Sequence, residues 1–301
     1  MYYFSLITSD YCEKAEMALI SFFHYNDVTL HLYVVDDNYD KVCNYFKNKY
    51  YFNKLDIIKY YDKAFTEKTL RLKTINDINW ISLTLNMYRI LDDVHDNELI
   101  RIDLDVLYFG KIDFAKYNHA LCGSHEESLH LPKPWHTPIY QINIGIAKYT
   151  KDKFNLKDSF TNEMLERLKA DSINYYIPDQ DILNELTDDK FAISDCIISA
   201  GTGYACQTRI KAFHYTSLYL KPWVVQSKDN LIQMFPTKIK TKALGFLLYE
   251  KFAQRTNLFL KETQTNIENI RQYRPNAIYY TTVSNKKEFE RLCGEINSWK
   301  I

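Results

Sequence analysis

The stretch Ile100-Arg101-Ile102-Asp103-Leu104-Asp105-Val106-Leu107-Tyr108 decides both the fold class and the candidate site. Apolar residues on either side of the two carboxylates predict a strand over residues 98–108 that the aspartates interrupt. Asp103 and Asp105 stand two residues apart, so extended backbone projects them to the same side. Open α/β sheets bind ligands beyond their strand ends, and paired carboxylates suit Mg²⁺ or Mn²⁺. The alternative is a turn with solvated charges.

On the amino-terminal side of this stretch, strand and helix patterns alternate along the chain. Such alternation predicts an α/β sheet with helices on both faces. Asp10 is expected to cap the first helix. The predicted strands cover residues 2–8, 28–35 and 54–61, and the predicted helices cover residues 10–24, 39–47 and 79–91.

On the carboxyl-terminal side the pattern is less regular, and we expect the catalytic motifs to end near residue 223. Residues 1–223 are predicted to form one domain, and 224–301 a mainly helical extension packed on it. The predicted strands cover 119–123, 139–149, 211–216 and 276–283, and the predicted helices 159–169, 179–186, 241–259, 261–273 and 286–299.

Composition excludes several classes of protein. The 301 residues carry 38 Lys+Arg and 38 Asp+Glu, so no basic excess favours nucleic acid as a partner. No glycine-rich phosphate-binding motif occurs. The six cysteines form no C-x-x-C pair, which fits a reducing compartment. Because neither a signal peptide nor a membrane-spanning run is evident, we expect a soluble cytoplasmic protein, in the host cytoplasm if the source is a virus.

Three further motifs follow the aspartate pair. In Tyr140-Gln141-Ile142-Asn143-Ile144-Gly145, the strand glycine indicates close approach of backbone or ligand, or a bulge. In Tyr176-Ile177-Pro178-Asp179-Gln180-Asp181-Ile182-Leu183-Asn184, proline and aspartate indicate a helix start. The third motif is the segment over residues 212–223. Its His214 could add an imidazole to the two carboxylates, and Lys221, before Pro222-Trp223, could contact a phosphate. A core histidine and a plain helix cap are the structural alternatives.

In this order the four motifs resemble those of glycosyltransferase family 8, which contains glycogenin and bacterial lipopolysaccharide galactosyltransferases. The segment Ile7-Thr8-Ser9-Asp10-Tyr11 resembles the strand end that holds the nucleotide base in this family, and Tyr88-Arg89-Ile90-Leu91 resembles its Y-R-[LI] helix. The resemblance covers about residues 1–223. It implies a GT-A fold, with a mixed, mostly parallel sheet flanked by helices, and retaining, metal-dependent transfer of glucose or galactose from a UDP-sugar.

The resemblance also implies roles for individual residues. Asp103, Asp105 and His214 would ligate Mn²⁺ or Mg²⁺, and Asp179 and Gln180 would be the catalytic pair. The last motif departs from the family pattern, because one residue is inserted and Ser217 or Leu218 stands in place of glycine. The other residues expected to contact the UDP-sugar are Thr8, Ser9, Asp10, Tyr11, Arg89, Leu104, Asn143, Ile144, Gly145, Ser217 and Lys221.

Several alternatives stay open at this point. The chain could be a self-glucosylating protein like glycogenin, a UDP-sugar-binding protein without turnover, or a haloacid-dehalogenase-like phosphatase with Asp103 as nucleophile. The acceptor could be a glycan, a lipid or a protein, and a homodimer is one of the assemblies left open. The loop over residues 124–138 lies between two site motifs, so we expect it to contact the acceptor.

Overall fold

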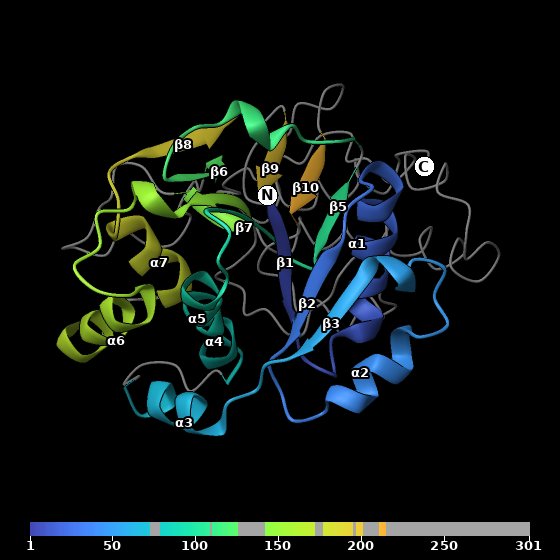
Figure 1. Ribbon diagram of the computed structural model, residues 1–301, viewed down its shortest axis with the longest axis horizontal. Helices are drawn as coiled ribbons and strands as arrows, with labels where there is room; N and C mark the ends of the chain where they lie inside the picture. The colour runs from blue at the N-terminus through green and yellow to red at the C-terminus, as the bar shows by residue number, and fades with distance from the viewer. Residues whose placement is uncertain are drawn as a thin grey trace, which may run out of the picture.

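The strands predicted before the two aspartates form one sheet. The computed structural model describes residues 1–72, 79–108, 110–125, 142–171, 177–194, 197–200 and 211–214. Within these residues the larger sheet has seven strands in the order β3-β2-β1-β4-β7-β6-β8 (Figure 1). They are β1 (Tyr2–Ile7), β2 (Leu30–Val34), β3 (Leu55–Lys59), β4 (Glu98–Ile102), β6 (Leu121–His125), β7 (Ile142–Thr150) and β8 (Lys190–Ile193).

This sheet is mixed and mostly parallel, as predicted. β7 runs antiparallel to both β4 and β6, whereas the other neighbouring strands pair in parallel. The carboxyl ends of β1, β2 and β4 therefore lie at one edge, where an open α/β sheet places its ligands.

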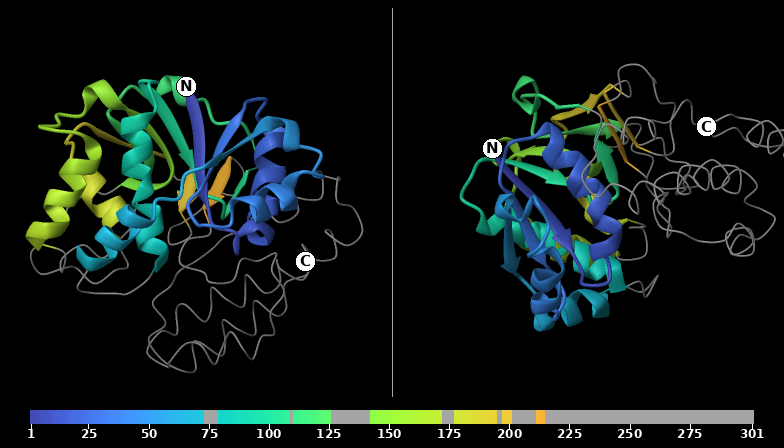
Figure 2. Two further views of the ribbon diagram at one scale, coloured as in Figure 1. Left: turned by 60° about the horizontal axis from the view of Figure 1, so that its bottom comes forward. Right: turned by 90° about the vertical axis from the view of Figure 1, so that its right-hand side faces the viewer.

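Helices cover both faces of the sheet (Figures 1 and 2). The blue helices α1 (Cys12–Tyr25) and α2 (Tyr39–Phe46) lie on one side. On the other side lie α4 (Asn79–Thr84), α5 (Asn86–Asp93), α6 (Phe160–Asp171) and α7 (Pro178–Glu185), with α3 (Lys63–Leu72) packed on α4 and α6. Among the described helices, none has the length and apolar character that a membrane span requires.

Strand alternation divides the core into one layer on each face. On β1, Tyr3 packs in the layer with α1, whereas Phe4 packs in the layer with α5. On β4, Ile100 and Ile102 belong to the α1 layer and Leu99 to the α5 layer. Since side chains alternate along a strand, Arg101 points to the same face as Leu99, toward α5 and α7.

A second, smaller sheet continues from the interrupted strand. In the described part of the chain it consists of β5 (Val106–Tyr108), β10 (Ala212–His214) and β9 (Ile198–Ala200), in the order β5-β10-β9. β10 runs antiparallel to β5, and its register sets His214 opposite Val106. The backbone N–H of Tyr108 donates to Ser21 Oγ on α1 at 3.0 Å, which fixes β5 on the first helix.

Some local predictions were wrong. The helix predicted over 79–91 is two helices, with a break at Leu85. Asp10 does not cap α1; the helix begins after Tyr11, and Asp10 accepts a hydrogen bond from the Thr8 hydroxyl. α3, β8 and β9 were not predicted. The boundary at 223 and the helical extension over 224–301 lie outside the described residues.

Candidate functional site

The residues after β4 and at the end of β10 form a cluster of metal-ligand type. Asp103, Asp105 and His214 each offer one ligand atom, and these atoms lie within 4.8 Å of one another. His214 Nε2 is 2.9 Å from Asp105 Oδ1 and 3.6 Å from Asp103 Oδ2. Two carboxylates and one imidazole are a donor set that suits Mn²⁺ or Mg²⁺. The chemistry of these residues thus fits the metal that the resemblance implies.

The imidazole of His214 is oriented by Asn143 on β7. His214 Nδ1 lies 3.0 Å from Asn143 Oδ1, and the same oxygen accepts the backbone N–H of Gly145 at 3.0 Å. A backbone N–H can only donate, so the Asn143 atom that faces it is the oxygen, and His214 Nδ1 must carry a hydrogen. In the neutral ring this leaves Nε2 unprotonated and turned toward the carboxylates. Such an outer partner fixes a histidine for metal binding.

Gly145 provides the space in which the ring lies. A Cβ atom added there would lie 2.0 Å from His214 Cε1 and 2.3 Å from Nδ1. The carbonyl of Gly145 also accepts the backbone N–H of Asp103 at 2.6 Å. The sequence had left a bulge and a close approach as alternatives, and both occur here.

The bulge is seen in the pairing of β6 with β7. Gly123 pairs with Ala147, whereas the next residue, Ser124, pairs with Asn143. A Cβ at Gly123 would lie 2.6 Å from Asn143 O, so this glycine allows the two strands to come together. The irregular segment of β7 turns its backbone from β6 toward the end of β4 and the ring of His214.

Arg101 is a site residue that the sequence analysis missed. It is 4% exposed, and its guanidinium contacts two carboxylates: Nε lies 2.9 Å from Asp103 Oδ1, and Nη1 lies 3.4 Å from Asp179 Oδ2. Burial lowers the pKa of Arg101, but Asp103 and Asp179 outweigh it and the net pKa is raised. Burial raises the pKa of Asp103, against the opposing charges of Arg101 and His214. A charge between apolar residues of a buried strand was the available signal, because such a charge must be paired.

The amino-terminal turn of α7 brings Asp179 and Gln180 to the same place. Tyr88 donates its hydroxyl to the carbonyl of Asp179 at 2.9 Å. Asn184 bonds both backbone groups of Ile142 at 2.8 Å, which ties α7 to β7. Gln180 is buried, and its Oε1 accepts the backbone N–H of Ile144 at 3.4 Å.

The carboxylate of Asp179 is only partly satisfied. One oxygen faces Arg101, while Oδ1 is buried and has no hydrogen-bond partner among the described residues. The predicted cap by Asp179 does not form, because Ile177 is the N-cap residue and no side chain caps the helix. Asp181 accepts the backbone N–H of Ile177 at 2.9 Å. Asp179 is therefore left free of a capping role, at the helix end where the dipole favours its negative charge.

The segment predicted to hold the nucleotide base follows β1. Tyr11 is half-buried and its backbone N–H donates to Thr8 O at 3.0 Å. Burial raises the pKa of the Tyr11 phenol, and the negative charges of Asp105 and Asp103 raise it further. The backbone N–H of Ser9 donates to Asp36 at 2.6 Å.

Three other predicted site residues have contacts of their own. Arg89 pairs with Asp62 at 3.5 Å, donates to Asn86 at 2.8 Å and covers the ring of Tyr60 at 4.6 Å. Leu104 is buried in the α1 layer and Ile144 in the α5 layer. Ser217, Lys221 and the loop from residue 126 lie outside the described residues.

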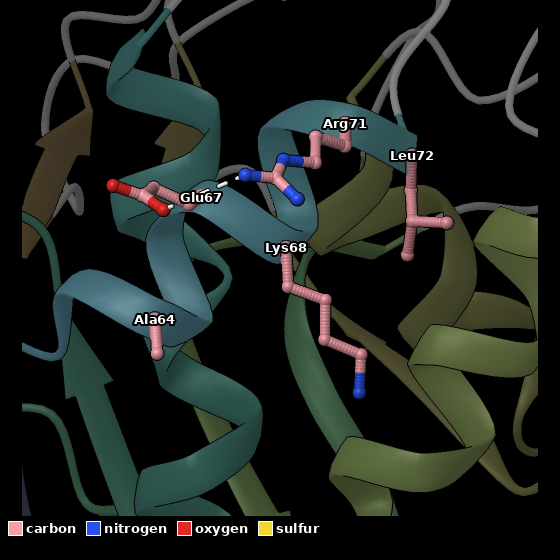
Figure 3. A pocket seen from close by; sticks show the side chains of 5 residues that line it. All are labelled: Ala64, Glu67, Lys68, Arg71 and Leu72. Atoms are coloured by element: carbon pink, nitrogen blue, oxygen red, sulfur yellow. Dashed lines mark ion pairs between the residues drawn. The ribbon is translucent and has the colours of Figure 1, made fainter.

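A hollow on α3 involves none of the predicted site residues. It is lined by Ala64, Glu67, Lys68, Arg71 and Leu72. Figure 3 shows Arg71 turned toward Glu67, with which it pairs at 3.7 Å. An exposed ion pair of this kind on one helix indicates an ordinary solvated surface.

Comparison with known proteins identifies the fold. No family model and no curated protein sequence matches the chain. The galactosyltransferase LgtC, solved in complex with donor and acceptor sugar analogues, is 12% identical, with a TM-score of 0.57 and coverage of 84% of this chain and 95% of that chain. GlyE of Streptococcus pneumoniae, also a glycosyltransferase, is 15% identical, with a TM-score of 0.52 and coverage of 75% and 57%.

The bifunctional glycosyltransferase WbbM is similar as well, at 12% identity and a TM-score of 0.52, with 74% of this chain and 46% of that chain covered. The chain therefore has the GT-A fold of these glycosyltransferases. This confirms the fold implied by the resemblance to glycosyltransferase family 8.

Proposed function

We propose that this chain is a metal-dependent, retaining glycosyltransferase that moves a hexose from a UDP-sugar to an acceptor. The observation that supports it best is the convergence of Asp103, Asp105 and His214 at the carboxyl end of β4. A second support is a buried carboxylate oxygen of Asp179 that has no hydrogen-bond partner among the described residues. Arg101 connects this carboxylate to Asp103.

The donor would be held at its nucleotide and phosphate ends by separate groups. Asp103, Asp105 and His214 would hold Mn²⁺ or Mg²⁺, and the bound ion would supply positive charge to the departing diphosphate. Lys221 would add a second positive charge there. Tyr11 would stack on the uracil, beside Thr8, Ser9 and Asp10.

The sugar end would be oriented by α7. Asp179 would accept a hydrogen bond from a donor hydroxyl through its free Oδ1, and Asn143, Ile144 and Gly145 would line the pocket. Gln180 is a poor nucleophile, so a covalent intermediate through it is disfavoured. In a front-face transfer the bond between the anomeric carbon and phosphate breaks, the acceptor oxygen bonds to that carbon, and the acceptor proton passes to the departing phosphate.

The proposal is tested by turnover of a panel of sugar nucleotides. The purified chain is incubated with Mn²⁺ and UDP-glucose, UDP-galactose, a GDP-sugar or a CMP-sugar, and nucleotide release is measured. We expect UDP release from UDP-glucose or UDP-galactose, lost on chelation and restored by Mn²⁺. Mass measurement of the protein and of candidate glycans, lipids and proteins then identifies the acceptor, self-glucosylation included.

Three results would contradict the proposal. Tight binding of a GDP- or CMP-sugar with no binding of UDP would exclude the donor. Binding of UDP-sugars without turnover would indicate a binding protein. Hydrolysis of a simple phosphoester with Mg²⁺, and of no UDP-sugar, would indicate a phosphatase.

A further inference from the structure

We infer that Arg101 is a positioning residue that sets Asp103 and Asp179 relative to each other, an inference that rests on the proposed function. Its guanidinium contacts Asp103 at 2.9 Å and Asp179 at 3.4 Å. These partners come from different elements, the end of β4 and the first turn of α7. One planar group thus joins the metal-ligand cluster to the turn that carries the proposed sugar contact.

In both Asp103 and Asp179, one carboxylate oxygen contacts Arg101 and the other does not. Asp103 Oδ1 faces Arg101, and Oδ2 is on the side of His214 Nε2, at 3.6 Å. Asp179 Oδ2 faces Arg101, and Oδ1 is buried without a partner among the described residues. A buried carboxylate oxygen without a hydrogen bond is costly, so Oδ1 is suited to a hydroxyl of the bound donor. Arg101 therefore orients the metal-facing oxygen and the sugar-facing oxygen together.

The guanidinium itself is held in place. Its Nη1 also lies 3.1 Å from Met87 Sδ, and the hydroxyl of Tyr149 lies 3.5 Å from the same sulfur. Arginine can hold two carboxylates in a fixed geometry because its donors form a rigid fork, whereas lysine carries a point charge.

The substitution Arg101→Lys tests this inference, because it keeps the charge and removes the fork. We expect Mn²⁺ affinity, measured by electron paramagnetic resonance of the free ion, to fall about 10-fold, and UDP-sugar turnover to fall about 100-fold. Arg167→Lys is the matched control. Arg167 is half-buried and pairs with Glu163 and Glu185 outside the site, so both quantities should stay at the wild-type level. Unchanged Mn²⁺ affinity in Arg101→Lys would overturn the inference.

A double-mutant cycle tests the link to Asp179. If Arg101 acts through Asp179, turnover in the Arg101→Lys, Asp179→Asn double variant should be no lower than in the worse single variant. Multiplied losses would show that the two residues act independently, and would overturn the link.

Different measurements test the inference about Arg101 and the proposed function, so one can be wrong while the other holds. A wild-type chain that turns over no UDP-sugar contradicts the function, while the Mn²⁺ titration still decides whether Arg101 holds Asp103. If Arg101→Lys does not fold by circular dichroism, Asp179→Asn tests the link from the other end. Glu185→Gln, an exposed position at the last turn of the same helix, is the control for charge. Weaker Mn²⁺ binding in Asp179→Asn than in the control supports the link, and equal binding overturns it.

Discussion

The position of the His214 ring depends on Gly145, a residue without a side chain. Its ring lies against Gly145, where a methyl group would overlap it, and its Nδ1 bonds the oxygen that also receives the Gly145 N–H. The metal-ligand cluster is therefore defined by the backbone of β7 as much as by the three ligand side chains.

The change Gly145→Ala should disrupt the cluster from outside its ligand set. The new Cβ would lie 2.0 Å from His214 Cε1, so the ring must rotate away from the carboxylates. We expect Mn²⁺ affinity to fall at least 10-fold, with a loss of about 1 to 3 kcal/mol in the free energy of unfolding. Adding His214→Ala removes the overlap, so the double variant should be as stable as His214→Ala alone. A double variant that keeps the full loss would place the strain elsewhere in β7.

Replacing either aspartate should separate the metal role from the structural role. Asp103→Asn and Asp105→Asn each remove a carboxylate charge, so Mn²⁺-dependent turnover should fall by a factor of roughly 100 or more. Asp103→Asn should also lower the melting temperature, because the buried Arg101 loses a partner. Wild-type turnover in either variant after chelation and Mn²⁺ addition would refute the metal assignment.

At this scale the sequence predicted residues that stand in recognisable motifs. Asp103, Asp105, His214, Asn143 and Gly145 stand in motifs of distinctive spacing, and the structure brings these residues together. Arg101 was not found, because the carboxylate beside it in the sequence, Asp103, was assigned to the metal. Its second partner, Asp179, is far along the chain and is brought to it by the packing of α7 on β7.

Among the elements, the strands with strong apolar patterns were predicted to within a few residues. β8 and β9 were missed because they have four and three residues, too few for a pattern. α3 was missed because only Phe65 and Thr69 are buried on it. The break before α5 was also missed, because the apolar pattern over 79–91 gives no sign of it. In the structure the side-chain amide of Asn86 donates to the carbonyl of Leu83, and this bond competes with the helix hydrogen bonds.

The first turn of α6 offers a pH-dependent test at this scale. Glu163 accepts hydrogen bonds from Arg167 and from the backbone N–H of Lys157, and these lower its pKa below the usual 4.5. A lowered pKa contributes stability above pH 4.5 that is lost as the pH falls through the folded-state value. Glu163→Gln should therefore cost about 1 kcal/mol at pH 7, a loss that shrinks below pH 4.5.

Thermal unfolding between pH 3 and pH 7 measures this difference. Glu166→Gln is the matched control in the same helix, because Glu166 is exposed and pairs only one turn away with Lys169; its effect should stay within about 0.5 kcal/mol. A Glu163→Gln deficit that persists unchanged at pH 3 would contradict the assignment to the ionised carboxylate.

For the molecule as a whole, the sequence predicted the GT-A fold through the order of its motifs. Composition alone indicated only a globular chain, since a fold is not specified by charge or length, and the alternation of strand and helix patterns added the α/β class. The smaller sheet was beyond prediction, because it joins β5 to strands that come much later in the chain.

Binding of the nucleotide should stabilise the whole chain. A ligand that binds only the folded state adds about 2.7 kcal/mol at a concentration of 100 times its Kd. UDP with Mn²⁺ should therefore raise the melting temperature in a concentration-dependent way, and chelation should remove the effect. An equal shift from CMP with Mn²⁺ would count against uracil recognition beside Tyr11.

The pairing of β10 with β5 has a consequence for how the molecule comes together. Asp103 and Asp105 leave the ribosome long before His214, so the nascent chain can build most of the larger sheet while its candidate cation site still lacks the imidazole. The site is completed only when β10, a strand of three residues, docks on β5. A cation bound by all three ligands would then hold β10 against the end of β4. Separation of β10 from β5 and release of the ion would therefore occur together.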